Sequence, residues 1–62
     1  MELVFDNESK EMEFKGSIEE LLRHLRLMRE EVVVKLNGRL APETTRIKPH
    51  DKIEVIKVVF GG

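Results

Sequence analysis

The residues with the clearest chemical potential in this 62-residue chain are the last two, Gly61 and Gly62, which directly follow the apolar run IEVIKVVF. A terminal carboxylate is a poor acylating group until it is activated, for example as an acyl-adenylate. Glycine places no side chain beside the reacting carbonyl, and it adopts backbone angles that other residues avoid. We therefore interpret Gly61–Gly62 as a flexible tail that can enter a narrow channel in a partner and present the Gly62 carboxylate to ATP. An inert, frayed end is the alternative.

Other residue types that carry chemistry are scattered. His24 falls on the polar side of a predicted helix, and His50 lies beside Asp51 in a predicted turn, without the several convergent ligands that a metal site needs. The carboxylates show no pairing in a predicted cleft, and Ser17 is explained by helix capping. The NGRL stretch has too few glycines for a phosphate-binding loop. We expect no catalytic residue, no metal and no bound cofactor.

Composition and length narrow the function classes. The chain has 11 basic and 12 acidic residues, a net charge of −1, three phenylalanines as its only aromatic residues, and no cysteine. A basic field or a base-stacking surface for nucleic acid is therefore not expected, nor are disulfides, a catalytic thiol or a thiolate metal site. No apolar run approaches the roughly 18 residues of a membrane span, and no signal sequence is visible. So short a chain has little room for an enclosed substrate pocket, which favours a binding or carrier protein over an enzyme. We expect this protein to be monomeric and cytoplasmic.

The first half of the sequence predicts a hairpin and a helix. The segments 2–6 and 11–15 have strand character, and the turn-forming DNES lies between them. Ser17 and Glu20 form a capping-box pattern after Gly16. Apolar residues at helical spacing then predict a helix from about Ile18 to about Arg29, and its apolar stripe consists of Ile18, Leu21, Leu22, Leu25 and Met28.

The second half predicts more strands. The segment 32–36 reads as a strand that is closed by a tight turn at Asn37–Gly38. Residues 39–52 form a long connection, with a short edge strand or one helical turn near 44–47. The segment 53–60 is apolar on both faces, which is typical of a central strand. The order predicts a single α+β domain over residues 1–62, with a mixed sheet of four to five strands and one helix across one face.

With these features together, the chain resembles the ThiS/MoaD sulfur-carrier family of ubiquitin-like β-grasp proteins, and the thiamine-biosynthesis carriers in particular. The resemblance rests on the element order, LNGRLAPE, KPHDKIEVIKVV and the final GG. Asn37 and Pro42 lie near family positions, and Asp51 and Ile53 match a G-D-x-I element. His50 stands where the family usually has glycine, and Phe60 where it usually has a small residue.

This resemblance implies a carrier cycle in which the protein is not an enzyme. An ATP-dependent activating enzyme adenylates Gly62, a persulfide sulfur donor converts it to a thiocarboxylate, and an acceptor synthase takes the sulfur for thiazole, molybdopterin or tRNA thiolation. Two alternatives stay open. One is a ubiquitin-like modifier that is attached to lysines through Gly62, and the other is a β-grasp interaction domain with an inert tail.

The surface that docks on the activating enzyme is expected on the sheet face away from the helix, near the tail. An apolar patch with a polar rim is the usual mark of such a surface. Core packing is the alternative role for Ile56 and Val58. The predicted patch consists of Leu40, Ile56, Val58 and Phe60, with Arg39, Arg46 or Lys57 as flanking charges.

Overall fold

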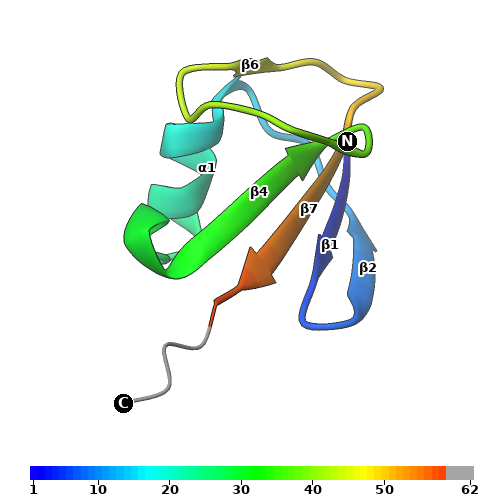
Figure 1. Ribbon diagram of the computed structural model, residues 1–62. Helices are drawn as coiled ribbons and strands as arrows, with labels where there is room; N and C mark the ends of the chain where they lie inside the picture. Colours follow the sequence, from blue (N-terminus) through cyan, green and yellow to red (C-terminus); the bar gives the residue numbers. More distant parts are fainter. Residues whose placement is uncertain (59–62) are drawn as a thin grey trace.

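The main sheet is mixed and has β7 (Lys52–Lys57) at its centre. In the computed structural model, which describes residues 1–58, the strand order is β2-β1-β7-β4-β5 (Figure 1). β7 runs parallel to β1 and antiparallel to β4. The prediction of a central last strand is thus confirmed. The other strands of this sheet are β1 (Glu2–Phe5), β2 (Glu8–Glu11), β4 (Val32–Leu36) and β5 (Arg39–Leu40).

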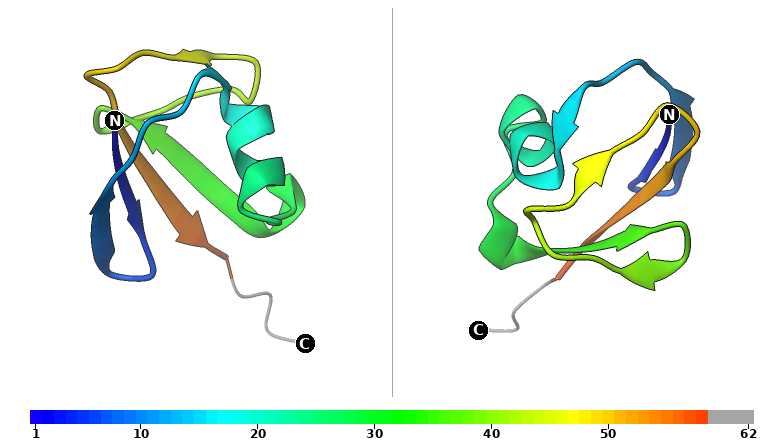
Figure 2. Two further views of the ribbon diagram at one scale, coloured as in Figure 1. Left: turned by 180° about the vertical axis from the view of Figure 1, so that it is seen from behind. Right: turned by 90° about the horizontal axis from the view of Figure 1, so that it is seen from above.

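One helix, α1 (Ile18–His24), covers one face of this sheet (Figure 2). Strand alternation sends every second side chain of the sheet toward it. Ile53 and Leu21 belong to the same core cluster, and both are 0% exposed. The fold predicted from the sequence, α+β with one helix across a mixed sheet, is confirmed. The buried core consists of Met1, Leu3, Ile18, Leu21, Leu22, Val34, Ile47, Ile53 and Val55.

The hairpin strand β2 lies earlier than predicted, at 8–11 and not at 11–15. Asp6 and Asn7 both adopt left-handed backbone angles, with φ of 54° and 63°, and they form a two-residue turn that pairs Phe5 with Glu8. This turn type matches the twist of the strands that it connects. All four residues of β2 are exposed, so the strand carries no apolar alternation that the sequence could reveal. Met12 and Phe14 pack against the core after β2 has ended.

The helix ends at His24, five residues before the predicted Arg29. Arg26 takes a left-handed φ of 60°, its N–H donates to Arg23 O at 3.0 Å, and the Leu27 N–H donates to Leu22 O at 2.9 Å. These two bonds form a Schellman C-cap, a motif that usually places glycine at the left-handed position. Because arginine and not glycine occupies this position, the sequence does not show that the helix ends here. Met28, predicted on the apolar stripe, is 59% exposed, and a 3₁₀ turn, η1 (Arg29–Glu31), leads into β4.

We expect Arg26→Gly to stabilise the protein by about 0.5–1 kcal/mol. The left-handed conformation costs a residue other than glycine about 1–2 kcal/mol, and glycine removes this strain from the folded state. Glycine also gives the unfolded chain more conformational freedom, which offsets part of the stabilisation. The free energy of unfolding from urea titration measures the effect. Arg23→Gly is the matched control, because Arg23 lies within α1 and its replacement should destabilise by about 1 kcal/mol. A lower stability of Arg26→Gly than of the parent chain would contradict this account of the C-cap.

The remaining elements show how the long connection over residues 39–52 is built. β3 (Gly16–Ser17) pairs with β6 (Arg46–Ile47), so the edge-strand alternative near residue 47 is correct and the helical turn is not. The capping box is present, with Ser17 Oγ and Glu20 N 3.3 Å apart. Asn37 and Gly38 form the predicted turn, with φ of 52° and 86°. Within residues 1–58 no helix is long and apolar enough to cross a lipid bilayer.

Candidate functional site

The end of β7 is the part of the described structure that precedes the diglycine. β7 is hydrogen-bonded to β1 on one side and to β4 on the other. The Val58 N–H donates to Glu31 O at 2.8 Å, so the chain is still tied to its neighbour one residue beyond the strand. The segment 59–62, which includes the predicted site residues Phe60, Gly61 and Gly62, lies outside the described residues. What the structure supplies is a firmly held base for that segment.

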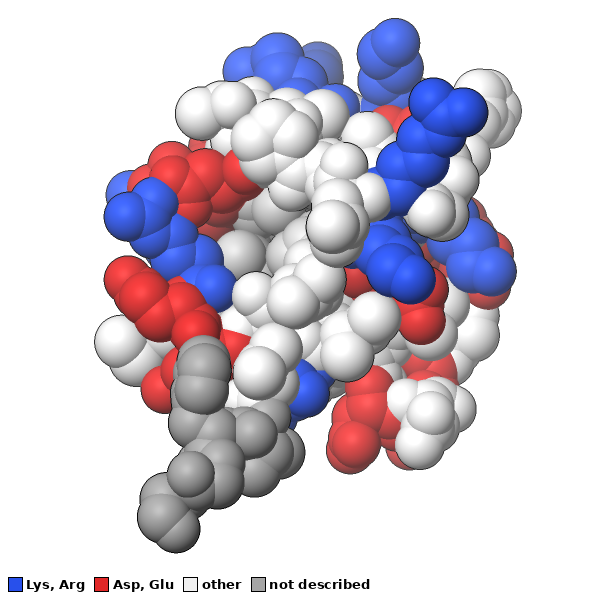
Figure 3. All heavy atoms as spheres, in the orientation of Figure 1, with Lys and Arg blue, Asp and Glu red and all other residues white. Residues whose placement is uncertain are grey.

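The predicted apolar patch is partly assembled on the sheet face away from α1. Leu40 is 71% exposed and Ile56 is 38% exposed. Leu40 pairs with Lys35, which pairs with Glu54 two residues before Ile56, so Leu40 and Ile56 share this face. Val58 follows at the same alternation and is half-buried. Figure 3 shows uncharged side chains over the middle of the sheet with charged side chains around them. Ile56 is therefore not a core residue.

The predicted flanking charges are less well gathered. Arg39 and Lys57 are exposed, but strand alternation puts them on the opposite faces of β5 and β7 from Leu40 and Ile56. Arg46 lies in β6, at the end of the molecule away from the exit of β7 (Figure 1). The structure does not bring Arg46 together with the patch. The short strand β6 fixes its position, and the sequence gives no signal for where that strand pairs.

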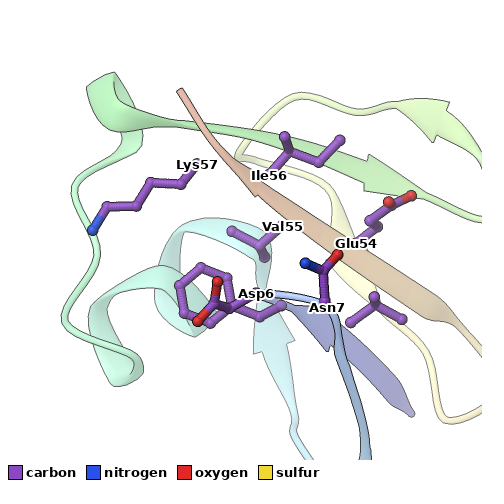
Figure 4. Close-up of a pocket in the computed structure, with 8 residues that line it drawn as sticks. Asp6, Asn7, Glu54, Val55, Ile56 and Lys57 are labelled. Carbon is purple, nitrogen blue, oxygen red and sulfur yellow. The ribbon is translucent and has the colours of Figure 1, made fainter. Parts of the chain in front are cut away.

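A groove beside the end of β7 is a feature that sequence reasoning missed. It has a volume of about 570 Å³ and lies between residues 54–57 and the β1–β2 turn. Figure 4 shows Ile56 on one side of β7, Val55 and Lys57 on the other, and the Asn7 side chain pointing toward the strand. The groove arises because β1 and β7 are parallel neighbours, so the turn after β1 stands beside the end of β7. Four of its eight lining residues are apolar and three, Asp6, Glu54 and Lys57, are charged, so the groove offers both apolar and charged contacts to a binding partner.

At the other end of β7, the residues Asn37 and Asp51, which carried the family resemblance, form one hydrogen-bonded corner. Asn37 Nδ2 donates to Asp51 Oδ1 at 3.0 Å, and the Lys52 N–H donates to Asn37 Oδ1 at 2.9 Å. The Lys48 N–H donates to Asp51 Oδ2 at 2.7 Å. The hydrogen bonds to the Asp51 carboxylate hold the pKa of Asp51 below its ordinary value of 3.8. The bond from Asn37 has the largest effect, and the bond from the Lys48 N–H has the next largest. This corner fixes the backbone at the start of β7.

We expect Asp51→Asn to cost about 1 kcal/mol of stability near neutral pH. The single side-chain oxygen of asparagine can replace one of the two carboxylate oxygens that accept hydrogen bonds from Asn37 and Lys48, but not both. The site is exposed, so solvent reduces the cost of the lost bond. Because the folded-state pKa of Asp51 is lowered, its contribution is complete above the ordinary value of 3.8 and is lost as the pH falls through the folded-state pKa. The stability difference between the parent and Asp51→Asn in urea titrations should shrink over that acid range. A difference that stays constant there would contradict the account.

The two histidines lie in separate parts of the described structure. The ring of His24 lies 5.8 Å from the ring of Phe14, and His50 is exposed beside Asp51. Within residues 1–58, no three His, Cys, Asp or Glu side chains are placed so that they could hold a metal ion. The candidate functional site therefore consists of the sheet face away from α1, the groove beside β7 and the segment that follows Val58.

Comparisons with known proteins agree with this geometry. The ThiS family model matches residues 1–62. The chain is similar to the crystal structure of the thiamine biosynthesis protein ThiS from Geobacter metallireducens, with 26% identity, a TM-score of 0.67 and complete coverage of both chains. An NMR structure of a thiamine biosynthesis protein from the same organism matches with 26% identity, a TM-score of 0.65, and coverage of 100% of this chain and 88% of that one. A search of curated protein sequences gave no match. The chain, with its β-grasp fold, belongs to the ThiS family.

Proposed function

We propose that this protein is a sulfur carrier that is charged at the carboxylate of Gly62. The observation that carries the proposal is the membership of the whole chain, diglycine included, in the ThiS family. The central position of β7 supports it, because a strand held on both sides gives the following residues a fixed starting point. The protein is then a substrate of an activating enzyme in the cytoplasm, where ATP is available, and not itself a catalyst.

The proposed charging reaction has three chemical steps. A Gly62 carboxylate oxygen attacks the α-phosphorus of ATP, and pyrophosphate leaves. The terminal sulfur of a protein persulfide then attacks the acyl carbon and AMP leaves, which gives an acyl disulfide. A thiol then attacks the donor's sulfur, forms a mixed disulfide with the donor and releases the Gly62 thiocarboxylate. We further propose that the sulfur goes to an acceptor synthase of thiazole formation, because the two similar structures described above are thiamine biosynthesis proteins. Molybdopterin synthesis and tRNA thiolation are the competing destinations.

The test is a reconstitution with the 62-residue chain, an activating enzyme from the same organism, ATP, a persulfide donor and a thiol. Intact-mass spectrometry should show a gain equal to the replacement of one oxygen by one sulfur, and AMP should form in equal amount. Omission of ATP should prevent both. AMP formation without sulfur incorporation, together with diglycine remnants on lysines of other proteins in cells, would favour a protein modifier. Neither AMP nor sulfur incorporation would favour an inert tail.

We also propose that the activating enzyme docks on the patch formed by Leu40, Ile56 and Val58. The support is the 71% exposure of Leu40 in β5 and the 38% exposure of Ile56 in β7, on the same sheet face. Lys35 and Glu54 lie between them on this face and add charged contacts. Exposed apolar side chains on a small domain are typical of interaction surfaces, whose centres are apolar.

Ile56→Asp should therefore raise the KM for charging by about tenfold or more, because it places a desolvated charge in the interface. The kcat should change less, since the tail is intact. The matched control is Lys10→Asp in β2, a strand whose residues are all exposed, at the outer edge of the sheet. Both variants should unfold near the urea midpoint of the parent chain. Equal KM values for the parent and Ile56→Asp would show that docking uses another surface.

A further inference from the structure

The end of the molecule opposite the exit of β7 carries a second hollow. Its volume is about 770 Å³, and it lies where the β3–β6 pair meets the start of β1. We propose that this hollow is a docking site for an acidic segment of a partner protein, separate from the surface that serves the tail. We call it the basic hollow and define it by Phe14, Lys15, Arg46, Ile47, Lys48 and Pro49.

The cations of the basic hollow are available to a partner. Lys15, Arg46 and Lys48 are exposed, and none of them takes part in an ion pair within residues 1–58. Two acidic residues also line the hollow. Glu11 lies 3.5 Å from the Met1 ammonium, which offsets its charge. The three cations then face Glu13 in the lining and the Asp51 carboxylate behind the Lys48 turn, so positive charge still predominates. The local field favours an anionic group, although the chain as a whole has a net charge of −1.

The floor of the basic hollow is apolar and firmly held. Ile47 is 7% exposed and Met1 is 5% exposed. Met1 exchanges two backbone hydrogen bonds with Met12, of 2.7 and 2.9 Å. The Asp51 carboxylate fixes the Lys48 turn from behind by accepting its N–H at 2.7 Å. A surface whose backbone is already fixed loses little freedom on binding, which favours affinity.

This combination fits a polypeptide with carboxylates beside an apolar side chain. The Arg46 guanidinium offers the planar fork that binds a carboxylate with two parallel hydrogen bonds. Phe14 and Pro49 give the wall against which an aliphatic side chain can pack. A nucleic acid fits less well, because backbone binding calls for a longer basic stripe and a basic domain.

The position of the basic hollow gives it a distinct role. β6 and the loop that enters β7 lie at one end of the molecule, and β7 exits at the other (Figure 1). Basic side chains gather along the upper edge of the molecule, over β6, in Figure 3. The six residues of β7 span on the order of 20 Å between these ends. One protein can therefore hold the basic hollow while another receives the tail, and this inference does not depend on the chemistry at Gly62.

The experiment is an NMR titration of the isotope-labelled 62-residue chain with the blocked peptide Asp-Glu-Leu-Glu-Asp-Leu. Amide signals of Phe14, Ile47 and His50 should shift, while those of Lys57 and Val58 stay in place. The affinity should fall as salt rises. Arg46→Gln should weaken binding by roughly fivefold to tenfold, the loss of one charge-assisted contact. Arg23→Gln, which removes the same group from the exposed side of α1, should leave the affinity unchanged.

Three results would overturn the proposal. The first is equal binding of the neutral peptide Asn-Gln-Leu-Gln-Asn-Leu, which would remove the role of charge. The second is equal weakening by Arg46→Gln and Arg23→Gln, which would make the effect non-local. The third is tighter binding of a short single-stranded oligothymidylate than of the acidic peptide at the same amides, which would assign the hollow to nucleic acid.

Discussion

Deletion of Gly62 is expected to lower the rate of adenylation by at least about a hundredfold. The shortened chain still ends in a glycine carboxylate, but its reach falls by one residue, about 3.5 Å of extended backbone. A misplacement of about 1 Å at a reacting centre can already cost about a hundredfold in rate. ATP-dependent AMP formation by the activating enzyme measures the effect, with the 62-residue chain as reference.

A chain of full length with a C-terminal amide separates reach from chemistry. It keeps both glycines and removes the nucleophilic oxygen, so adenylation should be absent while docking stays intact. Competition by the amidated chain against charging of the parent chain should show an inhibition constant close to the parent KM. Adenylation of the Gly62-deleted chain at a rate within threefold of the parent would contradict a role for the exact length of the tail.

The second large effect is expected from Ile53→Ala, which should destabilise the protein by about 2–5 kcal/mol. Ile53 is 0% exposed, and it pairs with Leu3 in β1 and Leu36 in β4. Its loss leaves a cavity under the central strand, in a domain whose total stability is expected to be on the order of 5 kcal/mol. Much of the variant should be unfolded at 37 °C, and urea titration at a lower temperature measures the free energy of unfolding.

Ile53→Val is the matched control, with an expected cost of about 0.5–1.5 kcal/mol, because it removes a single methylene group. Charging of both variants should follow the folded fraction, since Ile53 faces the core and not the partner. A cost below about 1 kcal/mol for Ile53→Ala would mean that β7 is not the structural centre of the domain.

The sequence predicted the parts of the fold whose determinants are local. Asn37–Gly38 specifies a tight turn by its backbone preferences, and Ser17 with Glu20 specifies the start of α1. The apolar character of both faces of segment 53–60 indicated a central strand, although β7 itself ends at Lys57. The observed strand order has the last strand at its centre, as this pattern indicated. The β-grasp topology as a whole was predicted from the resemblance to a known family.

The errors have equally specific causes. Asp6 and Asn7 are common in many turn types, so their left-handed angles, which fix the start of β2, were not visible in the sequence. Arg26 occupies a position where glycine would have marked the end of α1. Arg46 and the groove beside residues 54–57 depend on pairings between distant segments. Such long-range neighbours leave no local pattern, and therefore the candidate docking surface was predicted only in part.

The location of the incorporated sulfur tests the central claim most directly. Intact mass alone is ambiguous, because the chain has three methionines and the addition of oxygen to one of them changes the mass by nearly the same amount as an oxygen-to-sulfur exchange. Fragmentation of the charged chain in a high-resolution mass spectrometer resolves the two. The account predicts that the added mass lies only in fragments that contain Gly62 and equals an exchange of oxygen for sulfur. An added mass in fragments that end before Gly61, or equal to a gained oxygen, would contradict a thiocarboxylate at Gly62.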